Sequence, residues 1–376
     1  MKGNIDFKKH KSVLIDNARN AGYNAVAAFQ PENIYYTTGF WGEAVAICTD
    51  DRLALIVPKL EVLRAEDTSR GCDIIPSDRG DDFVKNILEN IRDKKKLCID
   101  KSDSFTLNYI QKELGRENVD VNNEVFLQTR AIKDQQELRR ISRCAQIIDT
   151  LYEICKDEIR VGMSEQELQA KLIYEGMKKG TNPSSYGATL NPLIVASGPN
   201  SSRPHAEVSN RKFQTGDVIV VDLTLRYDCY IADATRTFIL GKASNLVKKL
   251  YDVVRDSQDA GIIAVDRGVT CGQVDLACRA RMDSHGRNYS RHFIHSTGHG
   301  IGLDVHEKPW VRSKSQEILR KGMAITIEPG VYLQGKFGIR REDSLIVGDG
   351  DPVKKGNKKI KVKNLNHFTK EMLEIG

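Results

Sequence analysis

The stretch Val218–Leu240, VIVVDLTLRYDCYIADATRTFIL, decides the fold of this chain. Its two runs of apolar and β-branched residues, joined across residues 226–229, have the pattern of a β-hairpin. Asp222 and Asp233 interrupt the runs at strand positions that are otherwise apolar. Because an unpaired buried carboxylate is energetically costly, each aspartate needs a compensating partner.

The relative position of the two aspartates predicts that partner. If the turn is centred between Tyr227 and Asp228, Asp222 and Asp233 lie directly opposite each other, with Cβ atoms about 5 Å apart. Two carboxylates at that separation repel each other unless a cation lies between them. In the alternative arrangement, one aspartate caps a turn and the other pairs with Arg236. The hairpin by itself leaves both arrangements open.

A second stretch favours the cation. Ala324–Val331 (AITIEPGV) and Gly338–Val347 (GIRREDSLIV) form another predicted strand pair around a short loop centred on Gly335. Glu328 and Glu342 each lie seven residues from that glycine. In a hairpin without a bulge they would face each other, as a second carboxylate pair.

A histidine- and glycine-rich run lies between the two hairpins. Residues 295–307 read HSTGHGIGLDVHE and supply several imidazoles. Four carboxylates balance the charge of two divalent cations. Carboxylate-rich ligation with one imidazole favours manganese or cobalt over a structural zinc cage.

Length and composition set the wider frame. A chain of 376 residues with 40% hydrophobic content is expected to form two domains. The N-terminal MKGNIDFKKHK lacks an apolar signal segment, and no apolar run approaches the roughly 20 residues of a membrane span. We therefore expect a soluble, cytoplasmic protein with no membrane partner. The eight cysteines contain no C-x-x-C pair and are expected to be reduced core residues.

The net charge of +6 comes partly from a lysine cluster in residues 354–363. Aromatic residues are not interleaved with these lysines, and no nucleic-acid-binding motif is present. The cluster is typical of a solvated surface, so no nucleic-acid partner is expected.

The pattern of elements changes near Asp134. Residues 1–125 alternate short strands with amphipathic helices, which predicts an α/β domain with a mixed sheet. Its expected strands are 25–28, 44–48, 52–57 and 96–100, and its expected helices 8–21, 60–69, 81–92 and 105–114. From residue 130 onward, two pairs of long helices each precede a carboxylate hairpin. This order predicts an α+β domain, with an antiparallel sheet covered by helices on one side.

Helix boundaries in this second domain are marked by capping signals. The first helix is expected over 134–159. Ser164 with Glu167, and Thr270 with Gln273, have the spacing of capping boxes that start the second and fourth helices. The third helix is expected over 244–266 and the fourth over 271–285.

Five separated motifs carry a family resemblance. VVDLT, ADATRTF, HSTGHGIGLDVHE, TIEPGVY and GIRRED together resemble the dinuclear metallopeptidases of the pita-bread fold, in the Xaa-Pro aminopeptidase and Xaa-Pro dipeptidase (prolidase) branch. PENIYYTTGF, near residue 31, resembles the creatinase-type N-terminal domain of that branch. The resemblance implies a pita-bread catalytic domain over 130–376 behind a smaller α/β domain over 1–125. It also implies a homodimer and two divalent metal ions, manganese or cobalt in first place, with zinc or iron as alternatives.

The resemblance also assigns metal ligands in this sequence. Asp222 would chelate one ion, His299 and Glu328 the other, and Asp233 and Glu342 would bridge the two. Water held between two divalent cations ionises near neutral pH, which supplies a nucleophile for hydrolysis.

Further residues are expected to act on the substrate. Glu328 is the predicted proton shuttle to the leaving amine, and the resemblance points to His306 as a donor to the oxyanion. His205 is expected to contact the substrate around the cleaved bond. A single histidine is usually structural, but five of the eight lie between residues 285 and 306. The resemblance assigns three more residues to the substrate pocket: His295, Arg340 and Tyr332.

Arg340 has two expected partners, a substrate carboxylate or a ligand carboxylate. The sequence also departs from the family pattern at three positions. Thr224 and Cys229 stand where glycines are common, and Arg341 stands where an apolar residue is usual. None of these departures removes an expected ligand.

The implied activity is hydrolysis of the bond between an N-terminal residue and a following proline. That bond lacks an N–H, so most peptidases that grip an extended backbone cannot process it. Dipeptidase and aminopeptidase activities both remain open, and the fourteen-residue interval from Glu328 to Glu342 slightly favours small prolidase-like enzymes. Three alternatives are a methionine aminopeptidase, suggested by HEKPW, a creatinase-like enzyme, and a non-catalytic peptide-binding protein of the same fold.

Overall fold

The chain divides into two units, Met1–Arg130 and Ala131–Gly376. Its computed structural model describes residues 5–91, 96–184, 189–191, 193–265, 269–286, 288–348, 353–355, 358–360 and 362–376.

The first unit is built on a six-stranded mixed sheet in the order β4-β3-β2-β1-β5-β6. β1 pairs antiparallel with β2 and parallel with β5. The strands are β1 (Ala25–Ala28), β2 (Val45–Cys48), β3 (Leu53–Pro58), β4 (Asp73–Ser77), β5 (Leu97–Ile99) and β6 (Val119–Val121). The helices are α1 (Phe7–Asn20), α2 (Pro31–Thr38), α3 (Val62–Thr68), α4 (Asp81–Ile91), α5 (Ser104–Leu114) and α6 (Asn123–Ala131).

Both faces of this sheet are covered, because side chains of alternate residues enter two separate apolar clusters. Val26 packs with Leu14 of α1 in one cluster, and Ala27 packs with Ile87 of α4 in the other. The mixed α/β sheet confirms the predicted class of the N-terminal domain. Four elements were not predicted: α2, α6, β4 and β6. They are short, and the exposed and half-buried residues of β4 and β6 weaken the apolar pattern on which such a prediction depends.

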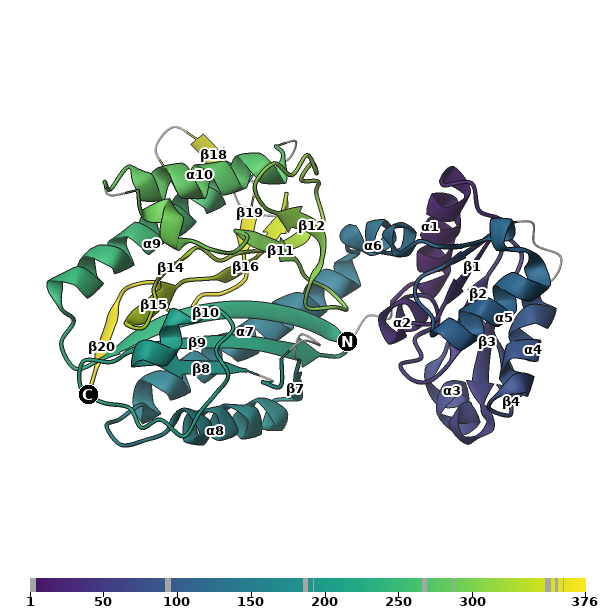
Figure 1. The fold of residues 1–376 in the computed structure, drawn as a ribbon, viewed down its shortest axis with the longest axis horizontal. Helices are drawn as coiled ribbons and strands as arrows, with labels where there is room; N and C mark the ends of the chain where they lie inside the picture. Colours follow the sequence, from purple (N-terminus) through teal and green to yellow (C-terminus); the bar gives the residue numbers. More distant parts are fainter. Residues whose placement is uncertain are drawn as a thin grey trace. The chain divides into compact units, whose positions relative to one another are not determined.

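The first half of the second unit packs two helices on a five-stranded sheet. Strands β20, β10, β9 and β7 are neighbours in that order, and β8 also pairs with β9. Figure 1 shows α7 and α8 together on the outer side of this sheet. The elements are α7 (Gln135–Glu158), α8 (Glu165–Lys178), β7 (Thr181–Pro183), β8 (Ile194–Ser197), β9 (Val218–Tyr227), β10 (Tyr230–Leu240) and β20 (Leu373–Ile375).

The second half repeats this plan with α9, α10 and a sheet in the order β12-β11-β13-β16-β19. β14 and β15 form a separate two-stranded ladder, as do β17 and β18. The helices are α9 (Asn245–Ala264) and α10 (Cys271–Asp283). The strands are β11 (Gly298–Gly300), β12 (Glu307–Val311), β13 (Ala324–Ile327), β14 (Gly330–Leu333), β15 (Phe337–Arg340), β16 (Asp343–Val347), β17 (Val353–Lys355), β18 (Lys358–Ile360) and β19 (Val362–Asn364).

The two halves meet strand against strand, with their helices outside (Figure 1). Among the described residues, an antiparallel β-bridge between Thr235 and Glu342 joins the two sheets. The predicted α+β class is confirmed, whereas the prediction of one antiparallel sheet with helices on one side was wrong. The described part of this unit has two five-stranded sheets, each with its own pair of helices, and β20 pairs parallel with β10.

The predicted register of the first hairpin was also wrong. Asp222 lies opposite Thr235, and Asp233 lies opposite Thr224. The turn is centred between Asp228 and Cys229, whose φ angles of 47° and 70° suit the two central positions of a tight hairpin turn. The shift is by two residues, so both aspartates still point to one face, but as diagonal neighbours.

The second carboxylate pair has the predicted register. Gly330 pairs with Arg340 on one side of the pair, and Ile327 pairs with Asp343 on the other. The same register through the junction places Glu328 across from Glu342.

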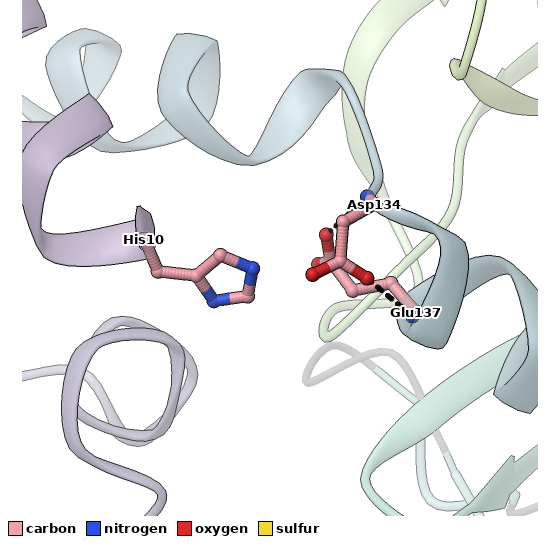
Figure 2. Close-up of side chains that lie close together, drawn as sticks. All are labelled: His10, Asp134 and Glu137. Atoms are coloured by element: carbon pink, nitrogen blue, oxygen red, sulfur yellow. Dashed lines mark hydrogen bonds between the residues drawn. The ribbon is translucent and has the colours of Figure 1, made fainter. Parts of the chain in front are cut away.

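The predicted capping boxes are confirmed at Ser164 with Glu167 and at Thr270 with Gln273. A third one, not predicted, joins Asp134 and Glu137 at the start of α7 (Figure 2).

His10, also drawn in Figure 2, lies on α1. Its ring stacks on that of Tyr36 with 4.0 Å between centroids, and its Nδ1 is 2.9 Å from the Tyr36 carbonyl oxygen.

All eight cysteines fall in described parts of the chain and are free thiols. Among the described helices, none combines the length and the apolar character that a membrane crossing requires.

The hairpin turn yields a stability prediction. Cys229 has a Cβ atom at a positive φ, which costs about 1–2 kcal/mol relative to a relaxed backbone. Cys229→Gly removes that strain but adds freedom to the unfolded chain, so we expect a net stabilisation of about 0.5–1 kcal/mol in urea unfolding. Cys229→Ala is the matched control, because it removes the thiol and keeps the Cβ. An equal gain from both substitutions would contradict backbone strain as the cause.

Candidate functional site

A cavity of about 420 Å³ in the second unit contains the predicted site. Nine of the ten residues predicted from the sequence line it, and Tyr332 contacts two of those nine. The lining residues among the predicted set are Asp222, Asp233, His299, Glu328, Glu342, His205, His295, His306 and Arg340. Both sheets contribute to the cavity, so its walls come from distant parts of the sequence.

The five predicted ligands converge in this cavity. Asp233, His299 and Glu342 each offer a ligand atom, and these three atoms lie within 4.8 Å of one another. The Oε1 atom of Glu328 is 3.5 Å from Nε2 of His299. Asp222 lies in the same wall, diagonal to Asp233 across the hairpin.

Two buried carboxylate oxygens mark where a cation would fit. Oδ1 of Asp222 and Oε1 of Glu342 have no hydrogen-bond donor among the residues that the structure describes. An anionic oxygen buried in this way is costly unless a cation or a donor compensates it. The donor set of carboxylate oxygens with one imidazole therefore fits divalent metal ions.

The electrostatics of the carboxylates lead to the same conclusion. Burial, followed by repulsion from the neighbouring carboxylates, raises the pKa values of Asp233 and Glu342 well above their usual range. Burial also raises the pKa of Glu328 to about 8, with Arg340 opposing this shift and Asp222 adding to it. Divalent cations would reverse these shifts, because their charge favours the ionised carboxylates.

His299 is held in the form that binds a metal. Its Nδ1 is 3.0 Å from the carbonyl oxygen of Gly300 and donates to it, which leaves the lone pair of Nε2 directed at the carboxylate cluster. Burial lowers the pKa of His299 to about 4, so the ring is neutral at physiological pH.

His306 lies against His299, with 4.3 Å between ring centroids and an interplanar angle of 80°. Burial, with His299 next to it, lowers the pKa of His306 to about 3. A neutral ring in the cavity wall, beside an expected ligand, suits a hydrogen-bond donor to a reacting oxygen.

Arg340 pairs with the carboxylate of Asp222, one of the expected ligands. Its Nη2 is 2.6 Å from Oδ2 of Asp222, in an ion pair whose arginine side chain is only 3% exposed. Its other nitrogens donate to the Thr235 hydroxyl, the Pro204 carbonyl and the Tyr332 hydroxyl. Of the two partners expected for Arg340, the structure shows the carboxylate of an expected ligand, Asp222.

A hydrogen-bond chain links Arg340 to His295 through Tyr332. The Tyr332 hydroxyl accepts from Arg340 at 2.9 Å and donates to Nε2 of His295 at 2.9 Å. Nδ1 of His295 donates to the Ser296 carbonyl at 2.8 Å, which fixes the tautomer. The three residues predicted to line the substrate pocket thus form one connected network.

Two threonines were missed by the sequence reasoning. Thr235 donates to Oε2 of Glu342 at 2.7 Å, and Thr224 donates to Oδ1 of Asp233 at 3.0 Å. The signal was present in the sequence, since each threonine stands opposite an aspartate in the true register. Thr224, a departure from the family pattern, therefore supports an expected ligand, Asp233. Arg341, another departure, is buried and pairs with Asp259 of α9 at 3.4 Å.

Comparison with known proteins identifies the family of each domain. Residues 139–349 match the metallopeptidase family M24, and residues 12–132 match the creatinase/prolidase N-terminal domain. An Xaa-Pro dipeptidase from Pyrococcus horikoshii is 31% identical over 343 residues, which cover 90% of this chain and 92% of that protein.

Solved structures agree over nearly the whole chain. An Xaa-Pro dipeptidase from Bacillus anthracis superposes with a TM-score of 0.87 at 27% identity, covering 98% of this chain and 100% of that one. An X-Pro aminopeptidase from Thermotoga maritima gives a TM-score of 0.83 at 27% identity, covering 97% and 99%. The predicted pita-bread domain behind a creatinase-type domain is confirmed. The chain belongs to the metallopeptidase family M24.

Proposed function

We propose that this protein hydrolyses the peptide bond between an N-terminal residue and a following proline. The observation that carries the proposal is the convergence of four carboxylates and one imidazole in one cavity, with two buried oxygens lacking donors among the described residues. A cavity of about 420 Å³ falls within the usual size range of small-ligand sites. The relatives described above are named Xaa-Pro dipeptidase or X-Pro aminopeptidase, and these names support the choice of substrate.

The proposed cofactor is a pair of divalent ions, manganese or cobalt in first place. Asp222 would hold one ion, His299 and Glu328 the other, and Asp233 and Glu342 would bridge them. When bound, the ions supply Lewis acidity, which acidifies water and polarises the scissile carbonyl. Thr224 and Thr235 hold two of these carboxylates in place by donating to them.

The protein's own groups would perform the proton transfers and orient the substrate. Glu328 passes a proton to the leaving nitrogen, for which a carboxyl in a buried wall is suited. His306 donates to the developing oxyanion. His205 and His295 contact the substrate around the cleaved bond, and the Tyr332–Arg340 network keeps His295 in one tautomer.

We further propose that the protein acts as a cytoplasmic homodimer and that catalysis lies entirely in the predicted domain of residues 130–376. The support is the family resemblance, together with the position of every predicted site residue after Ala131. Between the two activities of this branch, we propose dipeptidase, because the relatives include Xaa-Pro dipeptidases at 30–31% identity.

A substrate panel tests the activity. Metal-stripped protein restored with manganese or cobalt should hydrolyse Ala-Pro, with the release of proline followed by amino-acid analysis. Turnover of Ala-Pro-Ala would indicate aminopeptidase activity, and turnover of Met-Ala-Ser alone would point to a methionine aminopeptidase. Binding of all three peptides without hydrolysis would contradict the proposal and favour a peptide-binding protein.

Glu328→Gln tests the proton shuttle. Loss of the carboxylate should lower kcat by at least about 100-fold, the typical contribution of a general acid–base group, while the fold survives. Circular dichroism and the melting temperature check the fold. Glu153→Gln, at an exposed position of α7, is the matched control and should leave kcat unchanged. Wild-type kcat in Glu328→Gln would overturn the role of this residue.

The pH dependence of metal affinity tests the carboxylate cluster. In the metal-free protein the pKa of Glu328 is about 8, so its proton must leave when a cation binds near neutral pH. The affinity for Mn²⁺ should therefore rise between pH 6 and 8, by up to about tenfold per pH unit for each proton released. Calorimetry in buffers of different ionisation enthalpy measures the affinity and the number of protons.

The same shift sets the sign of the stability change. Glu328 has a raised folded-state pKa, so its contribution to the stability of the metal-free protein is present at low pH and lost as pH rises through about 8. Manganese should consequently raise the melting temperature more at pH 8 than at pH 6. An affinity that did not change over this range would be incompatible with buried, protonated carboxylates at the site.

A further inference from the structure

The carboxylate of Glu165 is buried outside the proposed site and accepts five hydrogen bonds. Glu165 is the first residue of α8 and is 0% exposed. Its Oε1 accepts from the backbone N–H and the hydroxyl of Ser197, both at 2.7 Å. Its Oε2 accepts from Nδ2 of Asn200 at 2.9 Å and from the N–H and hydroxyl of Ser209 at 3.0 and 2.7 Å.

These donors stand on both sides of His205 in the sequence. Ser197 ends β8, Asn200 lies in the short helix Gly198–Ser202, and Ser209 follows His205 by four residues. Both ends of the segment from 197 to 209 are therefore hydrogen-bonded to the carboxylate of Glu165, and His205, between those ends, lies in the cavity wall.

Arg211 reinforces this anchor. Its Nη1 donates to the Ser197 hydroxyl at 2.6 Å, and its backbone N–H donates to the Ser209 hydroxyl at 3.1 Å. Each hydroxyl thus accepts one hydrogen bond and donates its own hydrogen to Glu165. All five hydrogen bonds are donated toward Glu165, so the network requires a carboxylate whose two oxygens both act as acceptors. The N-terminus of α8 also favours a negative charge at this position.

The cavity end of the same segment is fixed by separate contacts. Arg340 donates to the Pro204 carbonyl at 3.0 Å, and Asn191 donates to the Ala206 carbonyl at 2.9 Å. The backbone N–H of Gly338 donates to the Ser201 hydroxyl at 3.0 Å. His205 itself is exposed in the cavity wall, so its position depends on the backbone that these contacts and Glu165 hold.

We propose that Glu165 is a positioning residue that sets His205 in the substrate cavity. The proposal rests on the proposed function in one respect, which is that His205 contacts the substrate. A small displacement of a substrate-contacting group can cost up to about 100-fold in rate. A glutamine at this position would retain one acceptor oxygen and present an amide donor to groups that are themselves donors.

Kinetics of Glu165→Gln provide the first test, using whichever Xaa-Pro peptide the wild type hydrolyses. We expect kcat/KM to fall at least tenfold, with unchanged manganese content. Glu167→Gln is the matched control, because Glu167 lies on the same turn of α8 but is exposed, and glutamine can still serve in its capping box. Glu167→Gln should change kcat/KM by less than about twofold.

A double-mutant cycle separates positioning from general support of the fold. If Glu165 acts through His205, Glu165→Gln should cost less than about twofold in a His205→Ala background. The same loss in both backgrounds would overturn the proposal. Ser209→Ala, which removes one of the five donors, is the milder variant in case Glu165→Gln does not fold. It should lower kcat/KM severalfold in the wild type and have little effect in His205→Ala.

Hydrogen exchange supplies a readout that does not need activity. In Glu165→Gln, or in Ser209→Ala, amides of residues 198–208 should exchange faster, while those of α7 and the body of α8 remain as in the wild type. Faster exchange across α7 and α8 to the same extent, or unchanged exchange in 198–208, would overturn the proposal. If the wild type cleaves no Xaa-Pro peptide, the proposed function fails, and hydrogen exchange still decides whether Glu165 holds the segment.

Discussion

Repulsion among buried carboxylates is the constraint on which the second unit depends. Four acidic side chains from two hairpins share one cavity, and burial together with mutual repulsion raises the pKa of three of them. The surrounding groups offset part of this cost. Thr224 and Thr235 donate to two of the carboxylates, and the guanidinium of Arg340 pairs with a third. Two oxygens still have no donor among the described residues, and they are the strongest structural argument for metal ions.

Strand periodicity made much of this site predictable. In a strand, side chains alternate between faces, so an acidic residue in an apolar run must point into the interior. That argument depends only on which face of the strand a residue occupies, and not on which residue of the neighbouring strand lies opposite it. It therefore placed Asp222 and Asp233 on one face of the hairpin, where both line the cavity, although the predicted register was wrong by two residues. The error came from the turn, because Asp228 and Cys229 carry no glycine signal and still adopt positive φ angles. The second hairpin has Gly335 at its centre, and its register was predicted correctly.

The remaining features depend on contacts between segments far apart in sequence. Nothing local to Arg340 distinguishes Asp222 from a substrate carboxylate as its partner, since the two residues are 118 positions apart. Glu165 looks in the sequence like an ordinary first-turn acid of a capped helix, beside an exposed Glu167 of the same type. The difference between the two glutamates becomes visible only in the fold, where Ser197 and Ser209 donate hydrogen bonds to Glu165. The division into two sheets was missed for a similar reason, because it depends on which strands share edges and not on their patterns.

The bridge between Thr235 and Glu342 has a consequence for how the two halves depend on each other. This backbone bridge joins the two sheets, and the Thr235 side chain also donates a hydrogen bond to the Glu342 carboxylate. Each half supplies one acidic hairpin, so neither half alone contains the complete set of expected ligands. A polypeptide severed between β10 and α9 would leave two of the five expected ligands in one fragment and three in the other. Metal occupancy would then report the reassociation of the fragments.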